Sequence, residues 1–331
     1  MFPTGHPKVS RTITLEEHFT LPGLEGSGRE NPGSPMGARL ARVNEQLSDL
    51  GDGRLREMDA AGIDLQVLSF GAPGVEPLEP ADSVSLARRV NDGLAEAIRR
   101  HPDRFAGLAT LPTPAPQEAA KELERCMRQL GFKGGVINGH TRGRYLDDPF
   151  FGPLLEAAEA LQAPIYLHPT PPPEPVFQAY YQGHFSAEVA SQFSRAGWGW
   201  HIETATHILR IILGGVFDRY PRLQFIIGHM GETLPFMLQR LDLTLPPQLT
   251  RLSQPVSHYL RQNVSYTFSG FNFTAAFLDL YLEMGAERIL FSADYPYSSM
   301  AQAREFLENL PVSAEDRERI AHGNAERLLK L

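Results

Sequence analysis

An apolar, β-branched run ends in two carboxylates and an imidazole: Thr12-Ile13-Thr14-Leu15-Glu16-Glu17-His18-Phe19. The run predicts a β-strand, in which side chains two residues apart point to the same face. Glu16 and His18 therefore share one face, and Glu17 takes the other. A carboxylate and an imidazole at the end of one strand suit a metal ion, although a chance Glu-x-His on a half-exposed strand is the alternative.

Seven further apolar runs follow, and helical patterns separate them. Alternation of strand and helix repeated eight times predicts a (β/α)8 TIM barrel in one domain spanning residues 1–331. A doubly wound parallel sheet is the alternative, because alternation alone does not close a barrel. The predicted strands are Arg11–Phe19, Leu65–Phe70, Phe105–Leu111, Gly134–Gly139, Pro164–Pro169, Phe225–His229, Val264–Gly270 and Arg288–Tyr295. The predicted helices are Gly53–Ala61, Ser83–His101, Pro116–Gly131, Phe150–Leu161, Trp200–Tyr220, Leu234–Leu241, Val256–Asn263, Thr274–Gly285 and Ser313–Leu331.

Two long insertions interrupt this alternation. The first, Pro22–Asp52, is rich in Gly, Pro and Ser and follows strand 1, and the second runs from Pro169 to Gly199 after strand 5. Both follow the carboxyl end of a strand, which is the face where barrel active sites lie. Loops of this length in a compact domain are usually functional or disordered, and we interpret them as walls or lids over a site.

Composition excludes several classes of partner. The chain of 331 residues has a net charge of −8 and no block of Lys or Arg, which argues against nucleic acid and anionic membranes as partners. No run of 18 apolar residues is present, and residues 1–11 lack the apolar core of a signal peptide. The single cysteine, Cys126, excludes an internal disulfide and favours a reducing compartment. We therefore expect a soluble, cytoplasmic protein.

Other predicted strands also end in residues that bind metals or transfer protons. His168 ends the fifth strand, His229 the sixth, and Asp294 lies near the end of the eighth. Buried parallel strands should be apolar throughout, so these polar ends indicate one shared cavity. The inventory suggests a single divalent ion held by Glu16, His18, His168 and Asp294, with Zn²⁺, Mn²⁺ or Fe²⁺ suiting two imidazoles and two carboxylates.

His229 and Glu232 lie three residues apart where a strand turns into a helix. That spacing lets the carboxylate orient the imidazole as an acid–base pair, although Glu232 acting only as a helix cap is the alternative. His201, beside Trp198 and Trp200, is a further candidate for lining the site. Trp200 and Phe19 offer aromatic walls for a flat substrate, unless they belong simply to the core.

At this point the sequence resembles a known family, the metal-dependent decarboxylases of the amidohydrolase superfamily. This group includes γ-resorcylate, 2,3-dihydroxybenzoate, 5-carboxyvanillate and aminocarboxymuconate-semialdehyde decarboxylases. The resemblance runs nearly from end to end. It is carried by Leu15–Phe19, Met58–Ile63, Leu167–Pro169, Gly215–Pro221, Gly228–Glu232, Phe291–Pro296 and Gly323–Ala325.

The resemblance implies the same barrel with one Zn²⁺ or Mn²⁺ on Glu16, His18, His168 and Asp294. It also implies that Arg240 serves the substrate site of a neighbouring subunit, so a homodimer or homotetramer is expected. An ion pair between Arg240 and Asp242 is the alternative role for this arginine.

The expected reaction is the non-oxidative decarboxylation of an ortho-hydroxyaryl carboxylate. Ring protonation at the carboxyl-bearing carbon would precede loss of CO₂, because the ring otherwise offers no sink for the electrons. Asp294 is the expected donor, with His229 and Glu232 setting its protonation and with direct donation by His229 as the variant. A metal-dependent hydrolase of a lactone or amide, and a metal-dependent binding protein without turnover, are the competing hypotheses.

Overall fold

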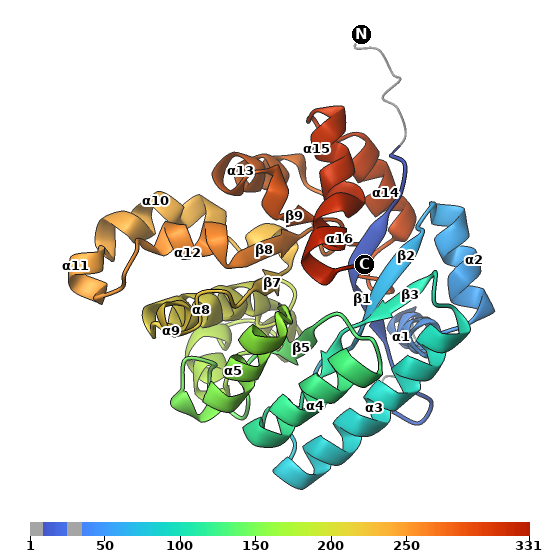
Figure 1. Cartoon of the computed structure of the whole chain (residues 1–331), viewed down its shortest axis with the longest axis horizontal. Helices are drawn as coiled ribbons and strands as arrows, with labels where there is room; N and C mark the ends of the chain where they lie inside the picture. The colour runs from blue at the N-terminus through green and yellow to red at the C-terminus, as the bar shows by residue number, and fades with distance from the viewer. Residues whose placement is uncertain (1–8, 25–34) are drawn as a thin grey trace.

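The computed structural model describes residues 9–24 and 35–331, and within these ranges nine short parallel strands form two sheets (Figure 1). Their orders are β1-β2-β3 and β4-β5-β6-β7-β8-β9. The strands are β1 (Ile13–Phe19), β2 (Leu65–Phe70), β3 (Phe105–Gly107), β4 (Ala109–Thr110), β5 (Gly135–Asn138), β6 (Ile165–His168), β7 (Phe225–Ile227), β8 (Val264–Thr267) and β9 (Ile289–Leu290).

Backbone contacts bridge both gaps between the two sheets. Only Leu108 separates β3 from β4, and its N–H donates to Leu68 O at 2.9 Å, so the two pieces are one strand position. At the other gap, Leu15 of β1 pairs in parallel with Ser292, just beyond β9. Eight strand positions therefore form a ring, as the alternation predicted. The predicted (β/α)8 barrel is confirmed, and the doubly wound alternative is wrong because an open sheet lacks these closing contacts.

Alternate residues of the strands divide the core into two layers. The inner layer fills the barrel with Ile13, Leu15, Leu65, Val67, Ala106, Leu108, Val136, Tyr166, Ile226 and Leu290. The outer layer packs the other face of the strands, for example Ile137, Leu167 and Ile227, against the helices. This two-sided burial explains why the strands are nearly continuous apolar runs in the sequence. Ala325 and Leu329 of the last helix join the inner layer and close one end of the barrel.

The helices surround the strands, and no helix of the described residues is long and apolar enough to cross a membrane. The predicted helices are all found, with boundaries shifted by a few residues and some divided into segments. The main helices are α2 (Asp52–Ala61), α3 (Pro80–Arg100), α4 (Pro116–Gln129), α5 (Gly152–Leu161), α8 (Gly199–Leu213), α9 (Val216–Arg219), α10 (Leu234–Thr244), α11 (Pro247–Thr250), α12 (Val256–Gln262), α13 (Thr274–Met284), α14 (Met300–Glu308), α15 (Ala314–Glu318) and α16 (Asn324–Leu329). Short turns of other helix types are η1 (Pro149–Phe151), η3 (His229–Gly231), η4 (Ala286–Arg288) and η5 (Arg319–Gly323).

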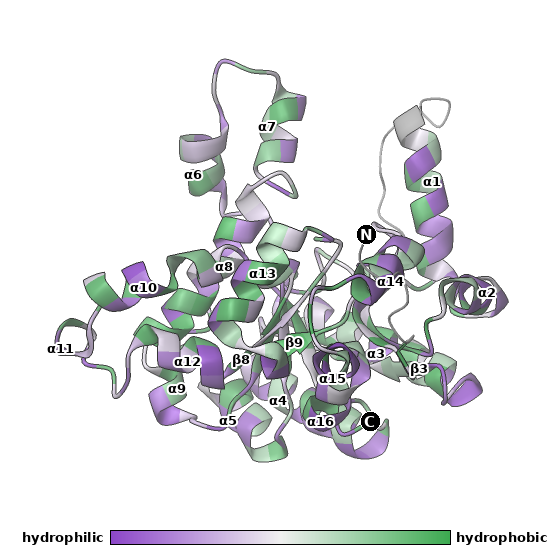
Figure 2. Cartoon of the chain, turned by 90° about the horizontal axis from the view of Figure 1, so that it is seen from above, coloured by the Kyte–Doolittle hydropathy of each residue, from purple (hydrophilic) through white to green (hydrophobic). Residues whose placement is uncertain are grey.

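Both insertions contain helices that the sequence reading missed. The first contains α1 (Pro35–Ser48), and the second contains α6 (Glu174–Val176), η2 (Phe177–Tyr181) and α7 (Ala187–Phe193). Figure 2 shows α1 and the α6–α7 hairpin rising from the same side of the molecule, opposite α16. Gly, Pro and Ser around these segments favour loops over the length of each insertion. A further helix, α14, lies between the predicted strand that ends at Tyr295 and the predicted helix that begins at Ser313. Residues 25–34 of the first insertion lie outside the described residues.

A buried arginine joins the first insertion to the barrel. The Arg54 side chain of α2 is fully buried, and its Nη2 donates to His18 O at 2.7 Å and to Gln46 O at 3.0 Å. Its Nε donates to Asp49 O at 2.9 Å, and its guanidinium lies 4.7 Å from the ring centroid of Tyr295. These contacts tie the end of β1 to the segment that leads into α2.

Replacing Arg54 with leucine should lower the free energy of unfolding by about 2–4 kcal/mol, because one buried and two partly buried carbonyls lose their donor. Denaturant titration measures the change. Arg128→Ala is the control, since that side chain is 68% exposed and pairs with Glu124 at 3.2 Å; its cost should stay below about 0.5 kcal/mol. Equal costs for the two variants would contradict this role for Arg54.

Candidate metal centre and active site

One extra residue in β1 turns two ligand-type side chains toward the interior. Ile13 and Leu15 point into the barrel, so strict alternation would direct Glu17 inward and Glu16 and His18 outward. The register against β2 shifts between Thr14 and Glu17, and Glu16 has a left-handed φ of 62°. This β-bulge inserts Glu16 and reverses the alternation that follows. Glu16 and His18 therefore share the inner face, as predicted, although for a different geometric reason.

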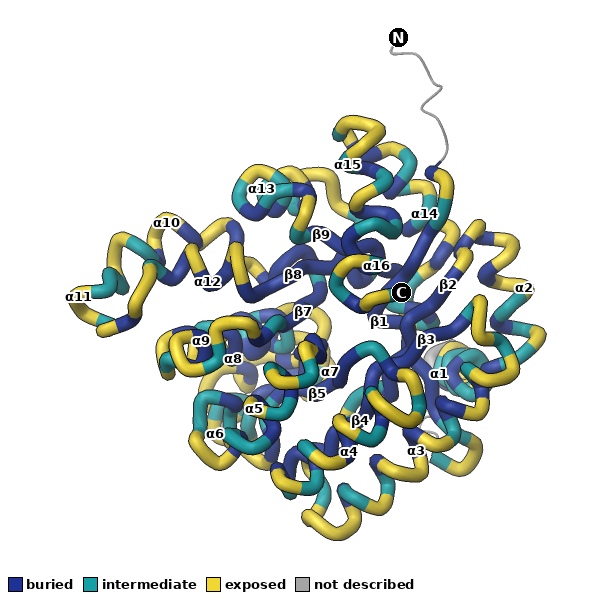
Figure 3. The backbone as a smooth tube through the Cα atoms, in the orientation of Figure 1, coloured by how far each residue is buried: buried dark blue, intermediate teal, exposed yellow. Residues whose placement is uncertain are grey.

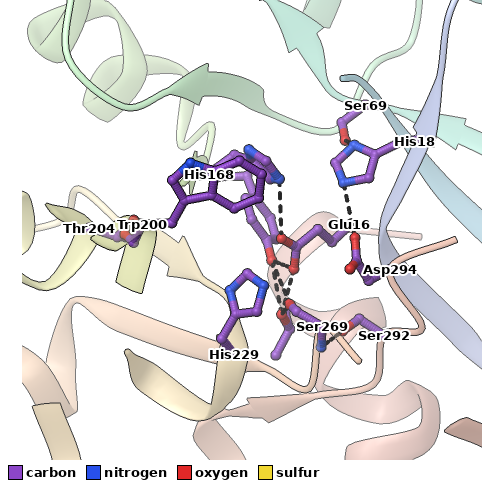
Figure 4. Close-up of polar contacts among 12 residues, drawn as sticks. Glu16, His18, Ser69, His168, Trp200, Thr204, His229, Ser269, Ser292 and Asp294 are labelled. Carbon is purple, nitrogen blue, oxygen red and sulfur yellow. Dashed lines mark hydrogen bonds and ion pairs between the residues drawn. The ribbon is translucent and has the colours of Figure 1, made fainter. Parts of the chain in front are cut away.

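The four predicted metal ligands come together at the end of the barrel where the insertions lie. His168 Nε2 is 3.5 Å from Glu16 Oε1, and His18 Nε2 is 3.3 Å from Asp294 Oδ1. The rings of His18 and His168 meet edge to face, with centroids 4.8 Å apart. Figure 4 shows these side chains converging from separate elements. Asp294, like Glu16, has a left-handed φ, of 64°, which aims its carboxylate into the group.

The chemistry of this group fits a divalent cation. Glu16 Oε1 and His18 Nε2 are buried and have no hydrogen-bond partner among the described residues. The other oxygen of Glu16, Oε2, accepts from Tyr166 and, at 3.3 Å, from Thr267, so the carboxylate is anchored on one side and free on the other. A Cβ at Gly228 would lie 2.8 Å from Oε2, which leaves room only for glycine there. Two imidazoles and two carboxylates with unpaired atoms match the ligand preference of Zn²⁺ or Mn²⁺.

The shifted pKa values of the four ligand-type side chains also favour a bound cation. Burial raises the pKa of Glu16 to about 8 and the pKa of Asp294 to about 7. Burial also lowers the pKa of His18 to about 3 and the pKa of His168 well below its ordinary value. The imidazoles are thus neutral and able to donate a lone pair, whereas the carboxylates need a positive charge beside them to stay ionised. A dication satisfies both requirements.

Glu17, on the opposite face of β1, holds the segment that carries Asp294. Its carboxylate accepts from Ala293 N at 2.8 Å and from Tyr295 N at 3.1 Å, the two backbone amides that flank Asp294. His18 N also donates to Tyr295 O at 2.8 Å. The three consecutive residues 16, 17 and 18 therefore supply two ligand-type side chains and the support for a third.

A second cluster lies beside the first and contains the predicted acid–base pair. His229 Nδ1 is 2.7 Å from Glu232 Oε1, which confirms their pairing and shows that Glu232 does more than cap a helix. Burial alone would lower the pKa of His229, but the charges of Glu232 and Glu16 raise it to about 10. Burial likewise opposes ionisation of Glu232, but the charge of His229 holds the pKa of this carboxyl below its ordinary value. A third member is His201, which the sequence indicates only as a candidate for lining the site; its Nδ1 is 2.6 Å from Glu232 Oε2.

The predicted substrate-binding residues occupy different positions. Trp200, at the start of α8, is partly buried, and its indole N–H is buried without a hydrogen-bond partner among the described residues. Phe19 lies in the outer core with its ring centroid 6.0 Å from that of Phe70, so its contact with a substrate stays a prediction. Arg240 is exposed on α10, within the arm formed by α10, α11 and α12 that extends from the barrel (Figure 1). No ion pair between Arg240 and Asp242 is found in the described part of the chain.

Comparisons with known proteins find similarity along nearly the whole chain. The family described as amidohydrolase matches residues 18–331. A γ-resorcylate decarboxylase of Polaromonas sp. is 38% identical over 334 residues, covering 96% of this chain and 98% of the relative. A solved dihydroxybenzoic acid decarboxylase of Polaromonas sp., with bound manganese and the inhibitor 2-nitroresorcinol, is 37% identical with a TM-score of 0.88, covering 97% of each chain. A 5-carboxyvanillate decarboxylase of Sphingomonas paucimobilis is 36% identical with a TM-score of 0.87, covering 97% of this chain and 99% of that one.

Glu16→Gln should abolish stoichiometric metal binding, because the amide keeps the shape of the side chain but loses the charge that balances the dication. Elemental analysis of the purified wild type should give about one divalent ion per chain. Glu203→Gln serves as the control, since Glu203 is a buried carboxylate that pairs with Tyr145 outside the ligand set. Retention of one tightly bound ion in Glu16→Gln would contradict the assignment.

Proposed function

The chain belongs to the amidohydrolase family, and we propose that it is a carboxy-lyase that removes CO₂ from an ortho-hydroxyaryl carboxylate of the hydroxybenzoate type. The observation that carries this proposal is the position of Glu16, His18 and His168, whose ligand atoms lie close enough to share one ion, with Asp294 beside His18. The imidazole–carboxylate pair of His229 and Glu232 lies next to them. Relatives of 36–38% identity over nearly the whole chain are named as decarboxylases of such compounds, which favours decarboxylation over hydrolysis of a lactone or amide.

Glu16, His18, His168 and Asp294 would hold the ion. When bound, a divalent metal supplies positive charge that orients the oxygen atoms of the substrate and stabilises their negative charge. The side chains around it fix the ligands: Tyr166 anchors one oxygen of Glu16, and Ser69 lies 3.4 Å from His18 Nδ1. Such support keeps each ligand atom aimed at one point. Manganese in a solved relative favours Mn²⁺, with Zn²⁺ as the other candidate.

Asp294 is the proposed proton donor to the carboxyl-bearing ring carbon. Burial raises the pKa of Asp294 to about 7 in the metal-free site, so this carboxyl takes up a proton more readily than an ordinary aspartate does. The charge of His229 pulls in the other direction and favours the carboxylate of Asp294. His229, held by Glu232, therefore sets how readily Asp294 gives up its proton, and in the variant mechanism donates directly from Nε2.

The proposed substrate contacts are Trp200, Phe19 and Arg240. The indole N–H of Trp200 offers an unused donor to a substrate oxygen. The guanidinium of Arg240 suits a carboxylate or phenolate. Because Arg240 is exposed on the extended α10–α12 arm, it would serve the site of a second subunit in a homodimer or homotetramer.

The exposed side chains of this region support such an assembly. Phe236 and Leu243 of α10 are 79% and 74% exposed, and Leu282 of α13 is 78% exposed. Figure 3 shows long exposed stretches on the arm. Large apolar side chains that are exposed close together often belong to an interface with another protein, whereas single scattered ones do not.

Two further expectations belong to this proposal. The whole chain, residues 1–331, forms one barrel domain, since a single family match spans residues 18–331. The protein works in a reducing compartment, the cytoplasm, in the breakdown of aromatic compounds; its single cysteine, Cys126, is buried in α4.

His229→Asn should lower kcat by roughly 10²-fold or more, the usual scale for loss of an acid–base group, and leave metal content near one ion per chain. The assay is release of ¹³CO₂ from a panel of carboxyl-labelled hydroxybenzoates, and Asp294→Asn should abolish turnover. Loss of metal in His229→Asn would make His229 a ligand. Hydrolysis of lactones or amides without any CO₂ release would overturn the proposed reaction.

Arg240→Ala should inactivate a homomeric enzyme and be complemented by Asp294→Asn chains. In co-expressed mixed oligomers, a site with intact ligands can meet an intact arginine from its neighbour, so some activity should return. His258→Ala, on the exposed face of α12, is the control and should leave homomers active. Absence of recovery in verified mixed oligomers would assign Arg240 to its own chain or to a structural role.

A further inference from the structure

His201 and His229 share one carboxylate although they come from different parts of the chain. His201 lies on α8, just after the second insertion, and its Nδ1 is 2.6 Å from Glu232 Oε2. His229 Nδ1 is 2.7 Å from the other oxygen, Oε1. Glu232 is 1% exposed, so both oxygens are committed to imidazoles in a water-poor setting. The two imidazole rings also contact each other, with centroids 4.7 Å apart.

The partners of His201 determine where its hydrogens lie. His201 Nε2 is 3.1 Å from Ala196 O, and because a carbonyl can only accept, Nε2 carries a hydrogen and donates it. The contact between Nδ1 and Glu232 Oε2 also contains a hydrogen, on the nitrogen or on the oxygen. In either arrangement Oε2 is engaged and cannot rotate toward His229. Oε1 is then the atom that accepts from His229 Nδ1–H, which leaves Nε2 of His229 as the nitrogen available to a substrate.

Packing around the cluster holds this arrangement in place. The ring of Phe271 lies 5.1 Å from the ring of His201 and 5.2 Å from that of His229, measured between centroids. His229 and Glu232 both have left-handed φ angles, 49° and 54°, so their segment is held in a conformation that non-glycine residues adopt rarely. A strained segment needs fixed partners, and His201 supplies a hydrogen-bonding contact to Glu232 from outside this segment.

We infer that His201 is a positioning residue that fixes Glu232 and, through it, the orientation of His229 and the hydrogen bond from its Nδ1–H. This inference rests on the proposed function, because it assigns a role within that reaction. It also gives the second insertion a link to the chemistry: Ala196 lies in that insertion and holds His201 from the other side. The same three side chains include enough donor atoms for a second metal ion, so the metal count is one of the tests.

Two substitutions separate the two contacts of His201. His201→Asn places an amide N–H near the position of Nδ1, where it can donate to Glu232, but it loses the contact with Ala196. His201→Gln places its amide near Nε2, where it keeps Ala196 and loses Glu232. We expect His201→Gln to lower kcat by about 10- to 100-fold, the scale found when a residue that orients a functional group is lost. His201→Asn should remain within about 3-fold of the wild type, and KM should change little in either. His258→Gln, an exposed histidine on α12, is the control.

A second readout does not need turnover. In zinc-loaded protein with ¹⁵N-labelled histidine, His229 is assigned by comparison with His229→Asn. Its Nδ1–H should be hydrogen-bonded to Glu232 in the wild type and in His201→Asn. The Nδ1–H signal should shift or split in His201→Gln. These spectra decide the role of His201 even if no tested hydroxybenzoate is decarboxylated, which would instead count against the proposed function.

Four results would overturn the inference. If His201→Gln is active and His201→Asn is not, the contact with Ala196 matters and His201 is a structural tether. If both variants keep full kcat and the wild-type spectrum, His201 has no role in positioning. If both variants lose activity equally, the N–H that His201→Asn directs at Glu232 does not preserve function, and positioning of Glu232 is not the role of His201. If the wild type binds two ions per chain and His201→Asn and His201→Gln each bind one, the cluster is a metal site.

Discussion

The β-bulge at Glu16 is the feature on which the rest of the site depends. Up to Leu15, β1 is an ordinary barrel strand whose inward side chains are apolar. One extra residue with φ of 62° brings Glu16 inward and changes the face that each later residue takes. Without the bulge, His18 would face the helices and Glu17 the cavity. A local departure from regular strand geometry therefore converts a packing strand into the strand that supplies two ligands.

This arrangement concentrates buried charge, and neighbouring elements compensate for it. Glu16, Glu17 and Glu232 are each no more than 1% exposed. Glu17 is satisfied by two backbone amides and Glu232 by two imidazoles, whereas Glu16 keeps one oxygen unpaired. Buried carboxylates without partners are destabilising unless a counter-charge is supplied. The unpaired oxygen of Glu16 thus indicates the position of a cation. Glu17 and Glu232, whose oxygens have hydrogen-bond partners, support the residues around that position.

The two insertions contribute to the site through the elements that follow them. The first is anchored by Arg54, which donates to the backbone of His18 and so reaches the ligand strand itself. The second ends where α8 begins, which places Trp200 and His201 at the barrel end that carries the ligands. Figure 2 shows helices of both insertions on one side of the molecule. The insertions therefore do more than cover a site, because each is hydrogen-bonded to a segment that forms it.

The sequence by itself determined the barrel, the eight strand positions and the four ligand-type residues. Buried parallel strands must be apolar, so a polar residue at a strand end stands out in the sequence, as His168 and Asp294 do. Three features were decided only by the tertiary structure. The bulge at Glu16 arises from pairing between strands, and no local pattern marks it. The helical segments of the second insertion are only three to seven residues long, so they depend on tertiary packing more than on intrinsic preference. His201 meets Glu232 across 31 residues, and a contact between distant segments depends on how the chain folds back rather than on spacing along it.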